Sequence, residues 1–153
     1  MLKIYIDADA CPVKNEVFKV AKRYNLITYV VANQYLNVPL DINIRMEAVT
    51  GSFDAADDWI VEKAVANDIV ITSDILLAER CVKKSVKVIG PKGNEFNEEN
   101  IGSAISGRKV AEHMRFTGHQ GTGPSAMTKA DKSNFLSTLD RIIQKIKRDN
   151  HEN

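Results

Sequence analysis

The chain has 153 residues, of which 44% are hydrophobic and 27% are charged, as expected of a soluble protein with one core. The formal net charge is +1, but residues 1–100 hold 12 basic and 15 acidic residues, whereas residues 101–153 hold nine and five. This acidic front with a basic tail is compatible with a metal site beside a phosphate-contacting segment, or with a solvated basic helix. No apolar run approaches the roughly 20 residues of a membrane span. Residues 1–3 lead directly into a predicted strand without the hydrophobic region typical of a signal peptide, and the two cysteines suggest no disulfide framework. We therefore expect a cytoplasmic protein with no membrane partner.

Strands and helices are predicted to alternate along the first 93 residues. Apolar and β-branched runs predict strands at 2–6, 26–31, 44–49, 69–72 and 86–89. Helical spacing predicts helices at 12–24, 54–66 and 76–84, and residues 33–43 have no clear period and are expected to form a loop. This alternation is typical of an α/β fold with a mostly parallel five-stranded sheet and helices on both faces.

The remaining residues are predicted to be helical and to complete one domain over residues 1–153. Residues 98–114 are expected to be helical in places, and 116–126 form a glycine-rich loop. Thr128 and Asp131 resemble a capping pair at the start of a last helix, although the residue three positions after the Thr of such a pair is usually Glu or Gln. An apolar stripe on this helix should dock on the domain; it comprises Phe135, Leu136, Leu139, Ile142, Ile143 and Ile146. The expected parts are an α/β core over 1–93 and a helical part over 94–150.

Acidic residues follow three of the predicted strands. They are Asp7 and Asp9 after the first strand, Asp54, Asp57 and Asp58 after the third, and Asp74 after the fourth. In a parallel sheet these positions share one edge, where ligands bind. At about 100° per residue, Asp54 and Asp58 lie about 40° apart on their helix and Asp57 points to one side. Val61 and Val65 continue the Asp54–Asp58 line, which predicts that these acids head the face packed on the sheet.

Clustered carboxylates repel one another unless a cation lies between them. Mg²⁺ or Mn²⁺ is the simplest cation, since both prefer oxygen ligands, and there is no His and Cys cluster for zinc. Such a site suits metal-assisted hydrolysis of a phosphodiester. Asp54 alone would be explained as a helix cap, but two further acids within one turn exceed what capping requires.

Four motifs resemble a known family. They are Asp7-Ala8-Asp9-Ala10-Cys11-Pro12-Val13-Lys14 and the stretches 54–60, 68–75 and 115–118. They are similar to motifs of the YaiI/YqxD family, small uncharacterised bacterial proteins grouped with the PIN-like nuclease superfamily, and the likeness runs from Ile4 to about Arg141. The superfamily implies divalent metal at Asp7, Asp58 and Asp74, with Asp9, Asp54 and Asp57 as second candidates.

The sequence also departs from these relatives. Flap-nuclease relatives carry a Glu where this chain has Ala55, which leaves open whether one ion binds or two. The family usually follows Arg-Phe-Thr-Gly with another glycine, whereas here His119 follows, which leaves the role of the 116–126 loop open.

Other residues have both a functional and a structural interpretation. Lys14, Ser73 and Arg115 are candidates for substrate binding; Lys14 would otherwise be a solvated surface residue, Ser73 a turn residue, and Arg115 a neighbour of a plain linker. Cys11 begins a helix, but its acidic surroundings favour a packed or capping cysteine over a nucleophile, and Cys81 is expected in the core.

Three functions remain as hypotheses. The first is a divalent-metal-dependent nuclease with RNA favoured over DNA, in which Asp7, Asp58 and Asp74 ligate the metal and Asp9 and Asp54 hold waters or a second ion. The second is a haloacid-dehalogenase-like phosphatase, with Asp7 as nucleophile and Asp9 as acid and base. The third is a non-catalytic module that binds nucleic acid or protein through its basic part.

Overall fold

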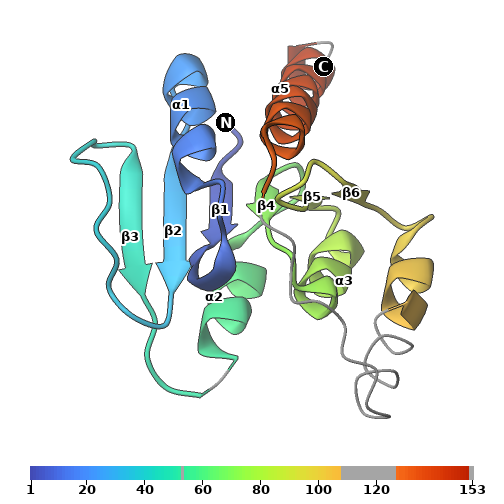
Figure 1. The fold of residues 1–153 in the computed structure, drawn as a ribbon, viewed down its shortest axis with the longest axis horizontal. Coiled ribbons are helices and arrows are strands. Elements are labelled where there is room, and N and C mark those ends of the chain that lie inside the picture. The colour runs from blue at the N-terminus through green and yellow to red at the C-terminus, as the bar shows by residue number, and fades with distance from the viewer. Residues whose placement is uncertain (53, 108–126, 152–153) are drawn as a thin grey trace.

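A six-stranded sheet forms the centre of the computed structural model, which describes residues 1–52, 54–107 and 127–151 (Figure 1). Its strand order is β3-β2-β1-β4-β5-β6, and every strand pair is parallel except β5 with β6. The strands are β1 (Ile4–Asp7), β2 (Thr28–Ala32), β3 (Ile44–Ala48), β4 (Ile69–Ile71), β5 (Lys87–Ile89) and β6 (Glu95–Phe96). The helices are η1 (Ala8–Ala10), α1 (Lys14–Tyr24), α2 (Ala55–Lys63), α3 (Ile75–Lys83) and α5 (Lys129–His151), and residues 101–107 are also helical.

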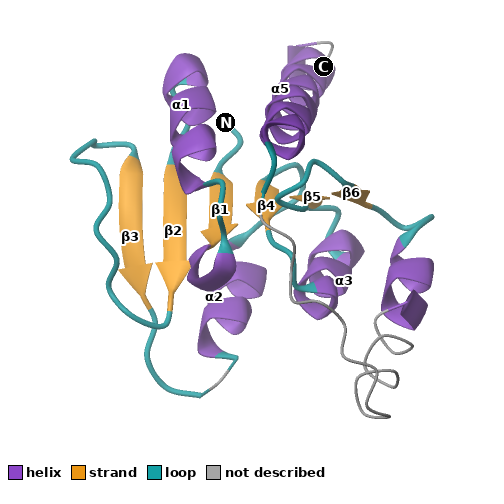
Figure 2. Cartoon of the chain, in the orientation of Figure 1, coloured by secondary structure: helices purple, strands orange, loops and turns teal. Residues whose placement is uncertain are grey.

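Helices cover both faces of the sheet, as predicted (Figure 2). Because side chains alternate along a strand, Ile4 and Ile6 of β1 face one side and Tyr5 faces the other. The first side forms a buried core with α1 and α5, and the second packs on α2 and α3. Each strand end is thereby held between two helical layers.

The predicted strands and helices of the α/β core are confirmed to within a few residues, and residues 33–43 form the loop expected of them. The sheet differs from the prediction in having a sixth strand, β6, which pairs antiparallel with β5 so that Val88 lies opposite Phe96. Two residues are too short to show a period of two in the sequence. In the predicted helical stretch 98–114, residues 101–107 are helical and 108–114 lie outside the described residues, as does the whole 116–126 loop.

The last helix begins and docks as its sequence predicts. The Thr128 hydroxyl accepts a hydrogen bond from the Asp131 amide at 3.0 Å, and the Asp131 carboxylate accepts one from the Thr128 amide at 3.1 Å. This reciprocal pair is a capping box in which Asp replaces the usual Glu. Phe135, Leu139 and Ile143 of the apolar stripe are fully buried against the sheet. Among the described helices, none combines the length and hydropathy that crossing a membrane requires.

Candidate acidic site

The strand order reverses direction between β1 and β4. From β1 the chain passes through α1 to β2 on one side, and β4 later pairs with the other side of β1. At such a switch point the connections leave in opposite directions and open a crevice beyond the carboxyl ends of the strands. Asp7 ends β1, and Thr72 and Asp74 follow β4, so these three residues lie at the crevice.

The Thr72 hydroxyl joins the two strand ends. Thr72 is only 1% exposed, and its Oγ1 donates a hydrogen bond to Asp7 Oδ2 at 2.7 Å. The same oxygen accepts a hydrogen bond from the backbone amide of Asp74 at 2.9 Å. One buried hydroxyl therefore fixes the orientation of the Asp7 carboxylate relative to the start of α3.

Asp74 is the N-cap of α3. Its Oδ1 accepts hydrogen bonds from the amides of Leu76 at 2.9 Å and Leu77 at 3.3 Å, which satisfies two of the free N–H groups of the first turn. Its Oδ2 has no hydrogen-bond partner among the residues that the structure describes. The carboxylate is thus held rigidly by one oxygen while the other is available to a ligand.

Asp57 on α2 has a strongly raised pKa. Its pKa is raised to about 6, first because it is partly buried and then because Asp7, Asp74 and Asp54 repel its negative charge. Arg80 opposes this rise. Asp57 therefore shares one electrostatic environment with acids from β1 and α3.

The Asp7 pKa is raised for similar reasons. Burial is the largest cause, and the charges of Asp74 and Asp9 add to it, whereas the hydrogen bond from Thr72 lowers the pKa. Acids from three distant parts of the sequence thus affect one another electrostatically at the carboxyl end of the sheet, and the metal that the sequence predicts there stays a prediction. Asp57 is the α2 residue that most clearly belongs to this group.

The face that α2 packs on the sheet differs from the prediction. The buried residues are Ala56, Ile60 and the following Ala64, whereas Asp54 and Asp58 are exposed and Val65 is 59% exposed. The Asp54–Asp58 line therefore does not head the packed face. The reason is that Ile60 packs on the sheet between two small alanines, and alanines give a weak hydrophobic signal in the sequence. Asp57 follows the buried Ala56 in the sequence and is itself half-buried.

Asp58 and Asp54 have different surroundings from those expected of them. Asp58 Oδ1 forms an ion pair with Arg80 Nη1 at 2.9 Å, with both side chains largely exposed. Asp54 occupies the N-cap position of α2, but its side chain makes no capping hydrogen bond. Capping therefore does not explain Asp54. Arg80, six residues after Asp74, was missed because no spacing in the sequence links α3 to α2.

Asp9 and Lys14 are both engaged with nearby backbone. The two oxygens of Asp9 accept hydrogen bonds from the Asn33 amide at 3.3 and 3.1 Å, which ties η1 to the end of β2. Lys14 Nζ donates to the carbonyl oxygens of Ala8 at 3.3 Å and Cys11 at 3.1 Å, so it closes the turn before α1. Ser73 is exposed beside the crevice. Arg115 lies outside the described residues.

Both cysteines are buried, as predicted. Burial raises the pKa of the Cys11 thiol, and it raises that of Cys81 to about 12. A thiol with a raised pKa is protonated at neutral pH and is a poor nucleophile. The candidate chemistry therefore rests on the carboxylates.

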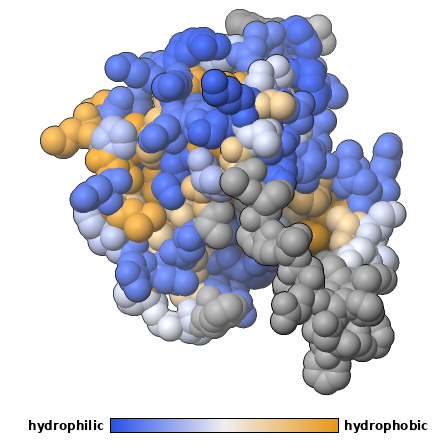
Figure 3. Space-filling model, in the orientation of Figure 1, coloured by the Kyte–Doolittle hydropathy of each residue, from blue (hydrophilic) through white to orange (hydrophobic). Residues whose placement is uncertain are grey.

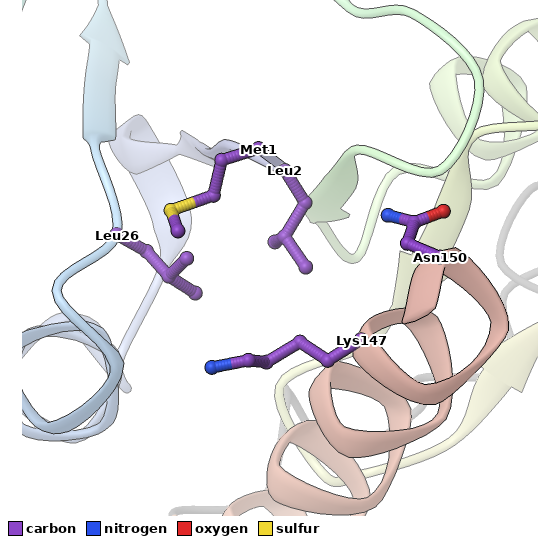
Figure 4. A pocket seen from close by; sticks show the side chains of 5 residues that line it. All are labelled: Met1, Leu2, Leu26, Lys147 and Asn150. Atoms are coloured by element: carbon purple, nitrogen blue, oxygen red, sulfur yellow. The ribbon is translucent and has the colours of Figure 1, made fainter. Parts of the chain in front are cut away.

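A pocket of about 280 Å³ opens at the opposite end of the strands, next to the residues that precede β1 and β2 (Figure 4). It is lined by Met1, Leu2, Leu26, Lys147 and Asn150, none of which is acidic.

Within the described ranges, no three Asp, Glu, His or Cys side chains gather closely enough to hold one metal ion among themselves. The acids consequently form an open cluster and not a closed metal cage.

A family model described as "Uncharacterized BCR, YaiI/YqxD family" matches residues 5–145. The chain is 46% identical to a UPF0178 protein of Rhodopseudomonas palustris, in an alignment that covers 97% of this chain and 96% of the relative. It is 47% identical to a UPF0178 protein of a Caulobacter species, over 97% and 98% of the two chains. A UPF0178 protein of Rhizobium meliloti is 48% identical over 95% of this chain and 99% of its own. No solved structure matches the chain.

Proposed function

The chain belongs to the YaiI/YqxD family, whose description names no activity, and we propose from its acidic site that it is a divalent-cation-dependent nuclease. The substrate of this proposal is a nucleic acid, with RNA favoured over DNA. The observation that supports it is the mutual electrostatic repulsion of Asp7, Asp57 and Asp74, which come from three separate segments near the switch point of the sheet. Clustered carboxylates repel one another, and groups whose pKa is perturbed in this way are concentrated at functional sites.

The oxygen donors of this site suit a hydrated hard cation. Mg²⁺ is usually bound by one or two carboxylates, with waters and substrate phosphate oxygens completing its shell, and no closed cage of protein ligands is needed. Asp7 Oδ1 and Asp74 Oδ2 have no hydrogen-bond partners among the described residues. These two oxygens would hold the cation, and Asp57 would lie close enough to feel its charge.

The phosphodiester chemistry divides between the cation and the protein. A bound Mg²⁺ or Mn²⁺ generates a nucleophile from water at neutral pH and offsets charge on the phosphate. Thr72 keeps Asp7 in one orientation, and the amides of α3 do the same for Asp74. Asp57 would accept the proton of an attacking water, because it is a half-buried carboxylate beside Asp7 and Asp74 and makes no hydrogen bond or ion pair with the described residues.

Cleavage of single-stranded RNA in the presence of Mn²⁺ tests this proposal. We expect Asp7→Asn and Asp57→Asn to reduce the rate at least about 100-fold, the lower range for loss of a general base or a charge-stabilising group. Asp149→Asn is the matched control, because it makes the same substitution at an exposed position of α5 and should leave the rate unchanged.

The outcome that contradicts the nuclease proposal is equal cleavage by the wild type and the two site variants. Binding of Mn²⁺ without turnover of RNA or DNA would instead support the non-catalytic hypothesis. The phosphatase hypothesis needs Asp9 as an acid and base beside Asp7, and the hydrogen bonds from Asn33 hold Asp9 against β2. The geometry therefore favours the nuclease over the phosphatase.

A further inference from the structure

The two edges of the sheet are very different. At one edge β6 is two residues long, and Arg141 of α5 pairs with its Glu95 at 2.8 Å. At the other edge β3 runs for five residues and pairs only with β2 among the described strands. A long open edge is a template for another strand, and proteins usually shorten, cover or charge such edges.

The outer side of β3 carries backbone groups that need partners. The Asn43 carbonyl accepts a hydrogen bond from the Thr28 amide at 2.7 Å, and the Val49 amide donates to Ala32 at 2.8 Å, so residues 43 and 49 face β2. Since this orientation alternates along a strand, 45 and 47 also face β2, and Met46 and Ala48 direct their N–H and C=O groups outward. Neither has a backbone hydrogen-bond partner among the described residues.

Exposed apolar side chains lie next to this edge. Tyr35, Leu40 and Ile42 of the β2–β3 connection are 71%, 107% and 86% exposed, and they make up half of the large hydrophobic residues exposed on the described surface. Figure 3 shows hydrophobic residues gathered on the side of the molecule where β3 and this connection lie in Figure 1. Exposed apolar patches of this kind mark interaction surfaces.

We propose that a second copy of this chain pairs with β3, antiparallel, about a two-fold axis at Met46. The two Met46 residues then form a hydrogen-bonded pair, and the outward amide of Ala48 donates to the outward carbonyl of Ile44 in the other copy. Ile44 already gives its own amide to Asp41 at 3.1 Å. Four backbone hydrogen bonds therefore join the copies without breaking any hydrogen bond within either copy.

The charges of β3 select this register. With Met46 on the axis, Arg45 of each copy lies opposite Glu47 of the other, in a non-hydrogen-bonded pair where side chains are closest. Moving the axis to residue 45 places arginine opposite arginine, and moving it to residue 47 places glutamate opposite glutamate. Charges of one sign would protect the edge by repulsion, whereas these alternating charges complement themselves when the strand meets its own copy.

The test is the mass of the full chain in solution, measured by sedimentation as a function of concentration. The wild type should reach twice the 17.0 kDa of the chain. Glu47→Arg places arginine opposite arginine in two symmetric pairs and should weaken dimerisation at least about tenfold. The double variant Arg45→Glu with Glu47→Arg has the same composition as the wild type and should restore the dimer.

A backbone variant provides an independent test of the strand pairing. Ala48→Pro removes an outward N–H, which an edge strand tolerates, and should also shift the chain to monomer while thermal unfolding shows an intact fold. A wild type that stays monomeric at high concentration would overturn the proposal and leave the edge to a strand of another protein. A dimer unaffected by Glu47→Arg and Ala48→Pro would overturn it as well.

Discussion

Replacing Asp57 by asparagine should stabilise the metal-free protein at neutral and alkaline pH. The folded protein raises the pKa of this carboxyl from 3.8 to about 6, so it binds the Asp57 proton more tightly than the unfolded chain does. Ionising Asp57 therefore lowers the free energy of unfolding as the pH rises from about 4 to about 6, and the whole cost is present above pH 6. Asparagine cannot ionise and avoids this cost.

The size of the effect follows from the pKa shift. At about 1.4 kcal/mol for each pKa unit, the rise from 3.8 to about 6 gives an upper bound of about 3 kcal/mol. Asp57 is only partly buried, and solvent screens its repulsion from neighbouring carboxylates, so we expect about 1–2 kcal/mol. Replacing an exposed acid usually changes the free energy of unfolding by less than about 0.5 kcal/mol, so the effect expected for Asp57 is distinguishable from it.

Urea unfolding in the presence of EDTA measures this difference. At about pH 8, Asp57→Asn should unfold at a higher urea concentration than the wild type, and at about pH 4 the two should coincide. Asp149→Asn, an exposed control, should follow the wild type at both values. A stability difference for Asp57→Asn that is independent of pH, or a loss of stability at pH 8, would refute the inferred repulsion.

Further predictions concern two buried hydroxyls, the cysteines and Arg80. Thr72→Val removes both hydrogen bonds of a buried hydroxyl and should lower the free energy of unfolding in urea by about 2–3 kcal/mol. The buried Thr28 hydroxyl has no partner among the described residues, so Thr28→Val should be neutral or stabilising by up to about 1 kcal/mol. The folded protein should react with iodoacetamide at pH 8 much more slowly than the urea-unfolded chain, because both thiols are buried and burial also raises their pKa; labelling at the rate of the unfolded chain would contradict this. Arg80→Gln should raise the Asp57 pKa further, measured by NMR titration, and an unchanged value would contradict the coupling.

The sequence predicts most of the sheet because its strands are apolar and sharply bounded. Ile69, Val70 and Ile71, for example, form a β-branched run that ends at a polar turn, and such a run has few alternatives to a buried strand. Alternation with helices then places the acids at the carboxyl end of the sheet. This step needs only the rule that parallel strands end on the same side.

The details of the site depend on packing that a sequence does not display. The helix α2 packs Ala56 and Ile60 on the sheet, so the half-buried acid is Asp57, while Asp58 reaches Arg80 on α3. β6 has two residues, and its pairing with β5 is a tertiary contact without a periodic signal.

A crystal soaked in Mn²⁺ tests most directly whether the acids of β1, α2 and α3 share one cation. Anomalous scattering locates Mn²⁺ independently of the protein density. We predict one strong peak at the crevice between β1 and β4, contacted directly or through one water by Asp7, Asp57 and Asp74. No peak at saturating Mn²⁺, or a peak contacted by acids of one segment alone, would contradict a shared cation site.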